Sequence, residues 1–284
     1  MTATHESFRV LVTGAAGNIG RAVCARFAAG RATISALTLD DSRPESAARV
    51  TVGDAGNPET VSEAIGGGVD VVVHLAAIPS PLEHSQLDVF ANNTRATFVV
   101  LEECAKAGVT RAVIASSYSI LGLRFAPHVL HPAYYPIDEA TPPQVEDAYA
   151  LSKLTDEATA AMMHRRHGLD VVALRFPFTS SWERLREVAE ACRADPWSMA
   201  PDSWSYLHVD DAAEAVWLAA TRPVTGFHPV LLAAPQTLAA EPTLDLIARY
   251  HPGTQVRADI PGRATPIDTG AIERLLGFRA TRLL

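Results

Sequence analysis

Two side chains with complementary acid–base chemistry lie four residues apart in the segment Tyr149-Ala150-Leu151-Ser152-Lys153. Residues 146–167 follow a helical pattern, and on a helix positions i and i+4 project from the same face. A tyrosine there can pass a proton to or from a substrate oxygen, while the positive charge of the lysine stabilises the phenolate. Ser117 ends a short apolar run and supplies a hydroxyl for the same oxygen, although serine after a strand is also a common turn former. We expect these three side chains to serve carbonyl reduction or alcohol oxidation.

A nucleotide-binding pattern stands near the start of the chain. The apolar run Val10-Leu11-Val12 leads into Gly14, Gly17 and Gly20, and a helical pattern follows at once. Such glycines permit a sharp turn, close approach of the backbone to a pyrophosphate, and packing of helix on strand. The N–H groups of the first helical turn, at Asn18-Ile19, then face the anion. A plain strand-to-helix turn can use the same glycines, but the strand and helix around them favour dinucleotide binding.

Two acidic residues follow the next predicted strands. Asp40 ends the apolar segment 34–39, where a carboxylate accepts hydrogen bonds from the adenosine ribose and repels the extra phosphate of NADP. This favours NAD, with NADP as the alternative because Arg43 is near enough to receive a phosphate. Asp54 follows the strand predicted at 50–52 and is either an adenine contact or a turn residue. The backbone after the strand 69–75, at Leu75-Ala76-Ala77, has small side chains that let it lie close to the cofactor.

Strands and helices alternate along most of the chain, which is typical of an α/β fold with a Rossmann-type doubly wound parallel sheet. We predict a dinucleotide-binding core over residues 1–178 and a small substrate-binding lobe over residues 179–284, interleaved with the last elements of the core. The Pro-rich and aromatic segment 122–144 is too long for a simple connector and is expected to overhang the site. Asp211 and Glu214 have the spacing of a capping box that opens a helix over 212–220.

Composition limits the partners. The 284 residues are 48% hydrophobic and carry a net charge of −8 without any long charged block, which gives no support for a nucleic acid or an anionic membrane as partner. A small molecule is the expected substrate. The odd number of widely separated cysteines and the polar start Met1–Ser7 predict a cytoplasmic protein with no disulfide and no metal site. The alanine-rich stretch 158–161 fits either a homodimer contact or packing on the sheet.

Several separated motifs together resemble one family. They are Thr13-Gly14-x-x-Gly17-x-x-Gly20, His74-Leu75-Ala76-Ala77, Asn93, Ser116-Ser117, Tyr149-x-x-Ser152-Lys153 and Leu207-His208-Val209-Asp210-Asp211. In this order they resemble the extended short-chain dehydrogenase/reductases, specifically the NAD-dependent epimerase/dehydratase group. The resemblance implies a catalytic triad of Ser117, Tyr149 and Lys153, with Asn93 as a supporting polar residue. It also implies that Lys153 holds the nicotinamide ribose and that Pro177 faces the nicotinamide.

The sequence departs from this family where nucleotide-sugar members bind their substrate. The turn Arg175-Phe176-Pro177-Phe178-Thr179 lacks the usual asparagine, and Trp204 stands where those members tend to carry a diphosphate-binding arginine. Arg184, Arg186 and Arg193 could replace it but are more simply a solvated helix face. We therefore favour oxidation of free sugars or uronic acids, or reduction of small ketones. A nucleotide-sugar epimerase or dehydratase with tightly bound NAD is the alternative within enzymes. A non-catalytic NAD-sensing regulator is the alternative of another class, and the intact Ser/Tyr/Lys set argues against it.

Overall fold

The computed structural model describes residues 8–284. The polar start Met1–Ser7, which the sequence analysis used, lies outside the described residues. Within this range, seven parallel strands form one sheet in the order β10-β7-β5-β4-β1-β2-β3. Its strands are β1 (Arg9–Thr13), β2 (Thr33–Thr38), β3 (Arg49–Val52), β4 (Val71–His74), β5 (Arg111–Ser117), β7 (Asp170–Phe176) and β10 (Phe227–Leu231). From the centre the chain runs outward through β2 and β3 on one side and through β4, β5, β7 and β10 on the other.

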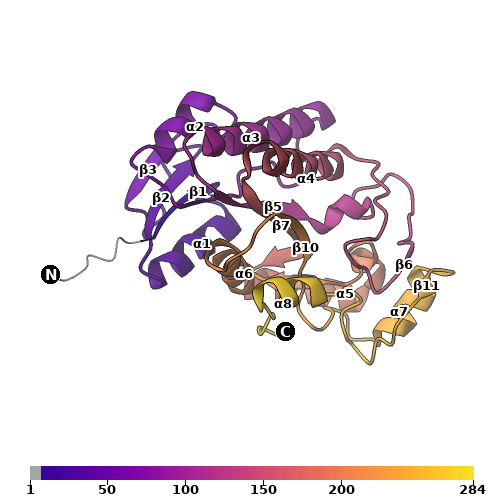
Figure 1. The fold of residues 1–284 in the computed structure, drawn as a ribbon. Coiled ribbons are helices and arrows are strands. Elements are labelled where there is room, and N and C mark those ends of the chain that lie inside the picture. Colours follow the sequence, from indigo (N-terminus) through magenta and orange to yellow (C-terminus); the bar gives the residue numbers. More distant parts are fainter. Residues whose placement is uncertain (1–7) are drawn as a thin grey trace.

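Helices cover both faces of this sheet (Figure 1). One face carries α2 (Pro58–Ile65), α3 (Gln86–Lys106) and α4 (Ala148–His167), and the other carries α1 (Asn18–Ala29) and α6 (Val209–Thr221). The predicted α/β fold with a Rossmann-type doubly wound parallel sheet is confirmed. In such sheets ligands bind beyond the carboxyl ends of the strands, at the point where the strand order reverses. Here that point lies between β1 and β4.

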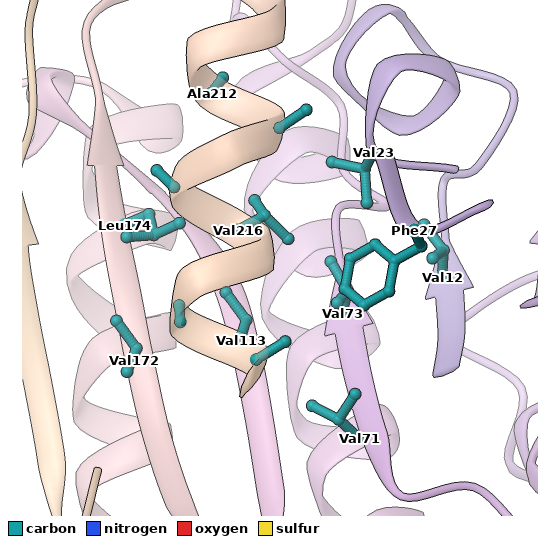
Figure 2. Close-up of a cluster of buried hydrophobic side chains, with 14 of the residues drawn as sticks. Val12, Val23, Phe27, Val71, Val73, Val113, Val172, Leu174, Ala212 and Val216 are labelled. Carbon is teal, nitrogen blue, oxygen red and sulfur yellow. The ribbon is translucent and has the colours of Figure 1, made fainter. Parts of the chain in front are cut away.

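The core follows from the alternation of strand side chains. Val10 and Val12 of β1 point into a cluster with α1 and α6, whereas Leu11 points to the opposite face and packs with α3. Figure 2 shows Phe27 of α1 and Val216 of α6 in the first of these clusters. Because helices bury both faces, the strands are nearly continuous apolar runs, as is typical of parallel sheets.

Polar caps set the ends of the two long helices. α3 begins at Gln86, because the hydroxyl of Ser85 accepts a hydrogen bond from the N–H of Asp88. α4 begins after Asp147, whose Oδ1 accepts from the N–H of Ala150 at 2.8 Å. This cap places Tyr149 in the first turn of α4. Along residues 8–284, no helix is long and apolar enough to cross a membrane.

A group of small elements, the lobe, lies beyond the carboxyl ends of the main sheet. It contains β8 (Phe178–Ser180), α5 (Trp182–Ala194), the 3₁₀ helix η2 (Pro196–Asp202), β9 (Tyr206–His208), α7 (Thr243–Tyr250) and β11 (Gln255–Val256). The segment 122–144 joins it through β6 (Tyr134–Tyr135), which pairs with β11. The 3₁₀ helix η1 (Tyr118–Leu121) and helix α8 (Gly270–Leu276) complete the chain. Residues 179–284 also supply β10 to the main sheet and α6 to one of its faces. The division of the chain at residue 178 stays a prediction.

The predicted capping box at Asp211 and Glu214 is wrong. α6 begins at Val209 and is capped by His208, whose Nδ1 accepts from the N–H of Asp210. Asp211 is buried and instead accepts hydrogen bonds from the N–H groups of Thr281 and Arg282 at 3.0 and 2.9 Å, and it pairs with the Arg282 guanidinium at 2.6 Å. The carboxylate therefore fastens the last described segment of the chain to α6.

Replacing Asp211 with alanine should lower the free energy of unfolding by about 2–3 kcal/mol, because a buried acceptor of charged and backbone hydrogen bonds is lost. Urea denaturation measures the change. Asp210→Ala is the matched control, since the Asp210 side chain is half exposed and its ion pairs contribute about 0–1 kcal/mol. Equal destabilisation by the two substitutions would contradict the role of Asp211.

Candidate active site

Two adjoining cavities open at the carboxyl edge of the sheet. The glycine-rich cavity, of about 320 Å³, is lined by Gly14, Gly17, Asp40, Asp54 and Ala76 among others. The Ser–Tyr–Lys cavity, of about 450 Å³, is lined by residues that include Ile19, Ser117, Tyr149, Lys153 and Pro177. Leu75 and Ala77, at the end of β4, line both cavities. The two cavities therefore form one elongated site that crosses the point of strand reversal.

The glycine positions fit a bound pyrophosphate. Gly14 has a φ of +64°, and a Cβ added there would lie 2.7 Å from the backbone nitrogen of Ala76. A Cβ at Gly20 would collide with the Gly14 carbonyl oxygen, so this glycine lets α1 pack on β1 without lining a cavity. Gly17 caps α1, and within residues 8–284 the cap has no side-chain hydrogen bond. The first-turn N–H groups, at Asn18 and Ile19, therefore need an acceptor, which an anion supplies.

The two acidic residues of the glycine-rich cavity are both structured by turns. Oδ1 of Asp40 accepts from the N–H of Ser42 at 2.9 Å, and hydrogen bonds from Ser42 hold the pKa of this carboxyl below its ordinary value. Oδ1 of Asp54 accepts from the N–H of Gly56 at 2.8 Å, so this residue shapes a turn and also lines the cavity. Arg43 is not among the described residues that line it.

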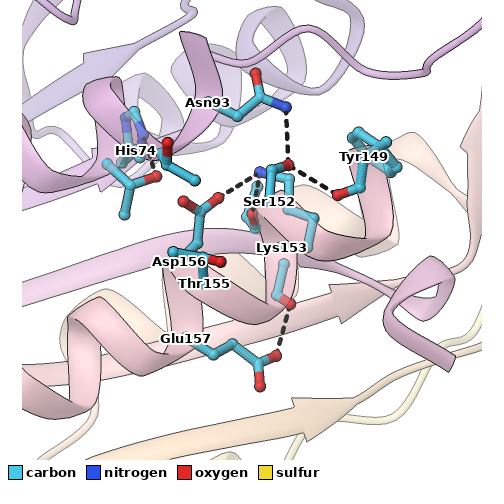
Figure 3. A network of polar contacts seen from close by, with 12 residues as sticks. His74, Asn93, Tyr149, Ser152, Lys153, Thr155, Asp156 and Glu157 are labelled. Atoms are coloured by element: carbon cyan, nitrogen blue, oxygen red, sulfur yellow. Dashed lines mark hydrogen bonds and ion pairs between the residues drawn. The ribbon is translucent and has the colours of Figure 1, made fainter. Parts of the chain in front are cut away.

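Ser117 at the end of β5 lines one cavity together with Tyr149 and Lys153 of α4. Figure 3 shows Tyr149 and Lys153 on α4. The ammonium of Lys153 donates to the carbonyl oxygen of Ala115 at 3.0 Å and to Asp156 Oδ2 at 3.1 Å. It lies 5.9 Å from the centroid of the Tyr149 ring. Ser117 Oγ accepts from the N–H of Ser119 at 3.0 Å. The three predicted catalytic side chains thus line one cavity, next to the turn that follows Gly14.

Asp156 keeps Lys153 charged. Burial is the largest single effect on the Lys153 ammonium and lowers its pKa. The charge and hydrogen bond of Asp156, together with the nearby Tyr149 and Glu157, outweigh burial and raise the pKa above its ordinary value. Both side chains are almost fully buried. Asp156 Oδ1 has no hydrogen-bond partner in the described part of the chain, so the carboxylate is held there mainly by the ammonium. Sequence reasoning missed Asp156, although its position three residues after Lys153 on a helix places the two on one face.

Asn93 is fully buried and lines neither cavity in the described residues. Its Oδ1 accepts from the N–H of Ile78 at 2.8 Å, and its Nδ2 donates to the Ile78 carbonyl and to Ser152 Oγ, both at 3.1 Å. Ser152 Oγ in turn donates to the carbonyl oxygen of Tyr149 at 2.8 Å (Figure 3). Asn93 therefore joins the loop after β4 to the helical turn that carries Tyr149.

The lobe aromatics stay away from both cavities. Among the described residues that line the cavities, Trp182, Trp197, Trp204 and Tyr206 do not occur. Trp204 is fully buried, and its Nε1 donates to the carbonyl oxygen of Pro196 at 2.8 Å. The lobe instead contributes Asp202, which the sequence did not single out, and the segment 122–144 contributes Arg124 and Phe125. The expected overhang by that segment is thus supplied by its first residues.

His74 is a buried neutral imidazole. Its Nδ1 lies 2.8 Å from Thr13 Oγ1 and its Nε2 lies 3.2 Å from Thr97 Oγ1. Burial, with a smaller effect of the Lys153 charge, lowers the pKa of His74 to about 3. Thr13 Oγ1 also accepts from the N–H groups of Leu75 and Ala76, at 3.2 Å each. His74 therefore helps to fix the ends of β1 and β4 against each other and is not exposed for catalysis.

The depressed pKa of His74 predicts acid destabilisation. The unfolded chain protonates this imidazole below pH 6.5 while the folded chain does not until about pH 3, so its contribution to stability is lost as pH falls between those values. Between pH 7.5 and 5, the wild-type protein should lose about 2 kcal/mol more unfolding free energy than His74→Asn. Urea denaturation at both pH values measures this. The exposed His84→Asn is the control and should follow the wild type; a His74→Asn protein with the wild-type pH dependence would contradict the assignment.

The comparisons with known proteins agree with this geometry. The family model for the NAD dependent epimerase/dehydratase family matches residues 10–232. Over 191 residues the chain is 30% identical to L-arabinose 1-dehydrogenase (NAD(P)(+)) of Haloferax volcanii. This alignment covers 63% of this chain and 70% of the dehydrogenase. Over 183 residues it is 33% identical to UDP-glucose 4-epimerase of Azospirillum brasilense. That alignment covers 61% of this chain but only 49% of the epimerase.

A solved structure shares the fold over nearly the whole chain. It is a short-chain dehydrogenase/reductase superfamily protein from Agrobacterium tumefaciens with bound NAD, 24% identical, with a TM-score of 0.72 and coverage of 97% of this chain and 93% of that one. The family model, the relatives and the shared fold agree with one another. The chain belongs to the NAD-dependent epimerase/dehydratase family.

Proposed function

We propose that this protein is an NAD-dependent oxidoreductase that transfers hydride between the nicotinamide and a carbonyl or alcohol carbon of a small, free polar substrate. The observation that carries the proposal is the meeting of Ser117, Tyr149 and Lys153 in the wall of one cavity, which continues into the glycine-rich cavity through Leu75 and Ala77. A sensor that only binds the nucleotide has no need of a buried ammonium held beside a phenol.

Each side chain has a separate role. The Tyr149 phenolate takes the proton from the substrate alcohol, and in the reverse direction the Tyr149 hydroxyl gives its proton to the carbonyl oxygen. Lys153 stabilises the phenolate electrostatically. Ser117 binds the same oxygen and orients it toward Tyr149. Bound NAD supplies the hydride acceptor or donor, and the protein supplies orientation and charge. The backbone at Gly14, Gly17, Asn18 and Ile19 would hold the pyrophosphate.

Further contacts complete cofactor binding. Asp40 would accept hydrogen bonds from the adenosine ribose, Asp54 would border the adenine, and the backbone at Leu75, Ala76 and Ala77 would lie along the cofactor. Lys153 would also hold the nicotinamide ribose, opposite Pro177. The ionised Asp40 in the cavity wall, with Arg43 outside that wall, supports NAD over NADP. Asn93 acts indirectly, through the loop and helix that it joins.

The cavity walls favour a free substrate over a nucleotide sugar. A diphosphate is best bound by a guanidinium in two-pronged geometry. Trp204 is buried away from the cavities, and Arg184, Arg186 and Arg193 are exposed on α5 and are not among the described residues that line the Ser–Tyr–Lys cavity. Arg124 does line this cavity, but its guanidinium is already paired with Asp202 at 2.9 Å. The relative from Haloferax volcanii is named for a free sugar, L-arabinose, which agrees with this proposal. The match to a UDP-glucose 4-epimerase keeps internal oxidation and reduction of a sugar nucleotide as the second candidate.

Tyr149→Phe should lower kcat/KM at least 1,000-fold, in line with the roughly 10²–10⁴-fold contribution of a general acid or base, while the Kd for NAD stays within about twofold. Absorbance of reduced nicotinamide is followed with pooled free sugars, uronic acids and alcohols, and NAD binding is measured by calorimetry. Tyr250→Phe, on α7, is the control and should keep full activity. Conversion of sugar nucleotides without net NADH, and no oxidation of any free compound, would establish the second candidate instead.

The three cysteines fit a reducing compartment. Cys24, Cys104 and Cys192 are all buried free thiols, and burial raises the pKa of the Cys24 and Cys192 thiols to about 11. Buried protonated thiols are poor nucleophiles and take no part in disulfide exchange. We place the enzyme in the cytoplasm on this ground.

We also propose a homodimer through the outward sides of α3 and α4, which pack side by side (Figure 1). Leu87 and Phe98 of α3 are 74% and 46% exposed, and Leu151 of α4 is 43% exposed. Ala160 is fully buried against the sheet, so only the neighbouring Ala158 is fully available to a partner. A second copy would cover these apolar side chains with its own.

Phe98→Glu combined with Leu151→Glu should convert the dimer to a monomer, because the interface would then bury like charges against each other. Light scattering coupled to size exclusion measures the mass. Val129→Glu, which changes another exposed apolar residue in the segment 122–144, should leave the dimer intact. A wild-type protein that is monomeric would rule the dimer out.

A further inference from the structure

An ion pair shares the wall of the Ser–Tyr–Lys cavity with the predicted catalytic side chains. Arg124, just after η1, and Asp202, at the end of η2, both line it. Arg124 Nη1 lies 2.9 Å from Asp202 Oδ2 and donates to the carbonyl oxygen of Ser198 at 3.1 Å. Asp202 is only 6% exposed, and its Oδ2 has no aligned hydrogen-bond donor within residues 8–284. A buried carboxylate in a cavity wall with unused hydrogen-bonding capacity needs a ligand or water to complete it.

Phe125 connects this pair to the reacting end of the cavity. Its ring packs edge-on against the ring of Tyr149, with centroids 5.9 Å apart, and the Arg124 guanidinium carbon lies 5.9 Å from the same Phe125 ring. A substrate whose oxygen meets Ser117 and Tyr149 therefore extends along Phe125 toward Arg124 and Asp202. The pair stands where the part of the substrate remote from the reacting carbon would lie.

The charges of the cavity wall balance at this end. Among the described residues that line the cavity, the charged side chains are Lys153, Arg124 and Asp202. Lys153 is already paired with Asp156, and Arg124 is paired with Asp202. Burial raises the pKa of the Asp202 carboxyl to about 6, with Arg124 opposing the rise, so the group is ionised at pH 8. The far end of the cavity is therefore strongly polar without a surplus positive charge.

We propose that the Arg124–Asp202 pair selects a neutral polyhydroxy substrate, of the aldose or polyol class, over the corresponding carboxylate. This inference rests on the proposed function of the site. A hydroxyl group both donates and accepts, so neighbouring hydroxyls can donate to Asp202 and accept from Arg124 at the same time. A carboxylate can only accept, and it would bring a second negative charge beside Asp202.

The test compares substrates that differ at one carbon: D-galactose with D-galacturonate, and D-glucose with D-glucuronate, at pH 8 with NAD. For the wild type, we expect kcat/KM for the preferred hexose to exceed that for its uronate at least about tenfold. Asp202→Asn removes the repelling charge and releases Arg124, so the uronate-to-hexose ratio should rise roughly 100-fold. Arg124→Met should lower turnover of both and leave the uronate the poorer substrate. Glu187→Gln, which removes the carboxylate of the exposed Arg184–Glu187 pair, is the matched control and should change nothing.

A binding measurement separates this inference from the proposed function. Calorimetry with the Tyr149→Phe protein saturated with NAD records recognition without turnover. Tighter binding of the hexose than of its uronate, reversed by adding Asp202→Asn, supports the inference even if no NADH ever forms and the oxidoreductase proposal fails. A uronate preferred by the wild type, or a ratio that Asp202→Asn leaves unchanged, overturns the inference while NADH formation would still support the oxidoreductase.

Discussion

The buried ammonium of Lys153 is the constraint on which the site depends. A charge out of contact with water is costly unless it is paired and hydrogen-bonded. Asp156 supplies the counter-charge from the next turn of α4, and the Ala115 carbonyl supplies an acceptor from β5. The helix that carries Tyr149 and the strand that ends at Ser117 are therefore joined by the ammonium to which we assign stabilisation of the phenolate. The contacts of the Lys153 ammonium thus hold α4 on the sheet and also fix the positive charge beside Tyr149.

The parts of the site that sequence predicts are those whose geometry is local. Gly14, Gly17 and Gly20 lie within one turn between strand and helix, and Tyr149 and Lys153 lie one turn apart on a helix. Ser117 needed only the recognition that parallel strands end at a common edge. The fold followed from the same regularities, because buried parallel strands and amphipathic helices have distinct apolar periods. Helix ends depend on individual caps and not on these periods, so the helix predicted over 212–220 in fact begins at Val209, where His208 caps it.

The parts that sequence missed depend on pairing over long separations. Asp211 has the spacing of a cap, yet its partners Thr281 and Arg282 come from the far end of the described chain. Arg124 and Asp202 meet only because the fold brings the segment after η1 against the end of η2. Neither residue belongs to a periodic pattern, and nothing local distinguishes them from solvated charges. In this member of the NAD-dependent epimerase/dehydratase family, regular strands and helices form the core. The Arg124–Asp202 pair, which we propose contacts the substrate, comes from irregular segments.

The hydrogen bonds of Asn93 limit which side chains can replace it in this fold. Its amide accepts from the Ile78 N–H and donates to both the Ile78 carbonyl and Ser152, so it uses a donor and an acceptor at once. Aspartate has the same shape but no donor, and leucine has neither, so each would leave buried backbone groups of the loop after β4 unsatisfied. Side chains of similar shape can often replace one another in an apolar core, but at Asn93 they would lose hydrogen bonds. A residue that lines neither described cavity thus restricts which substitutions this part of the molecule tolerates.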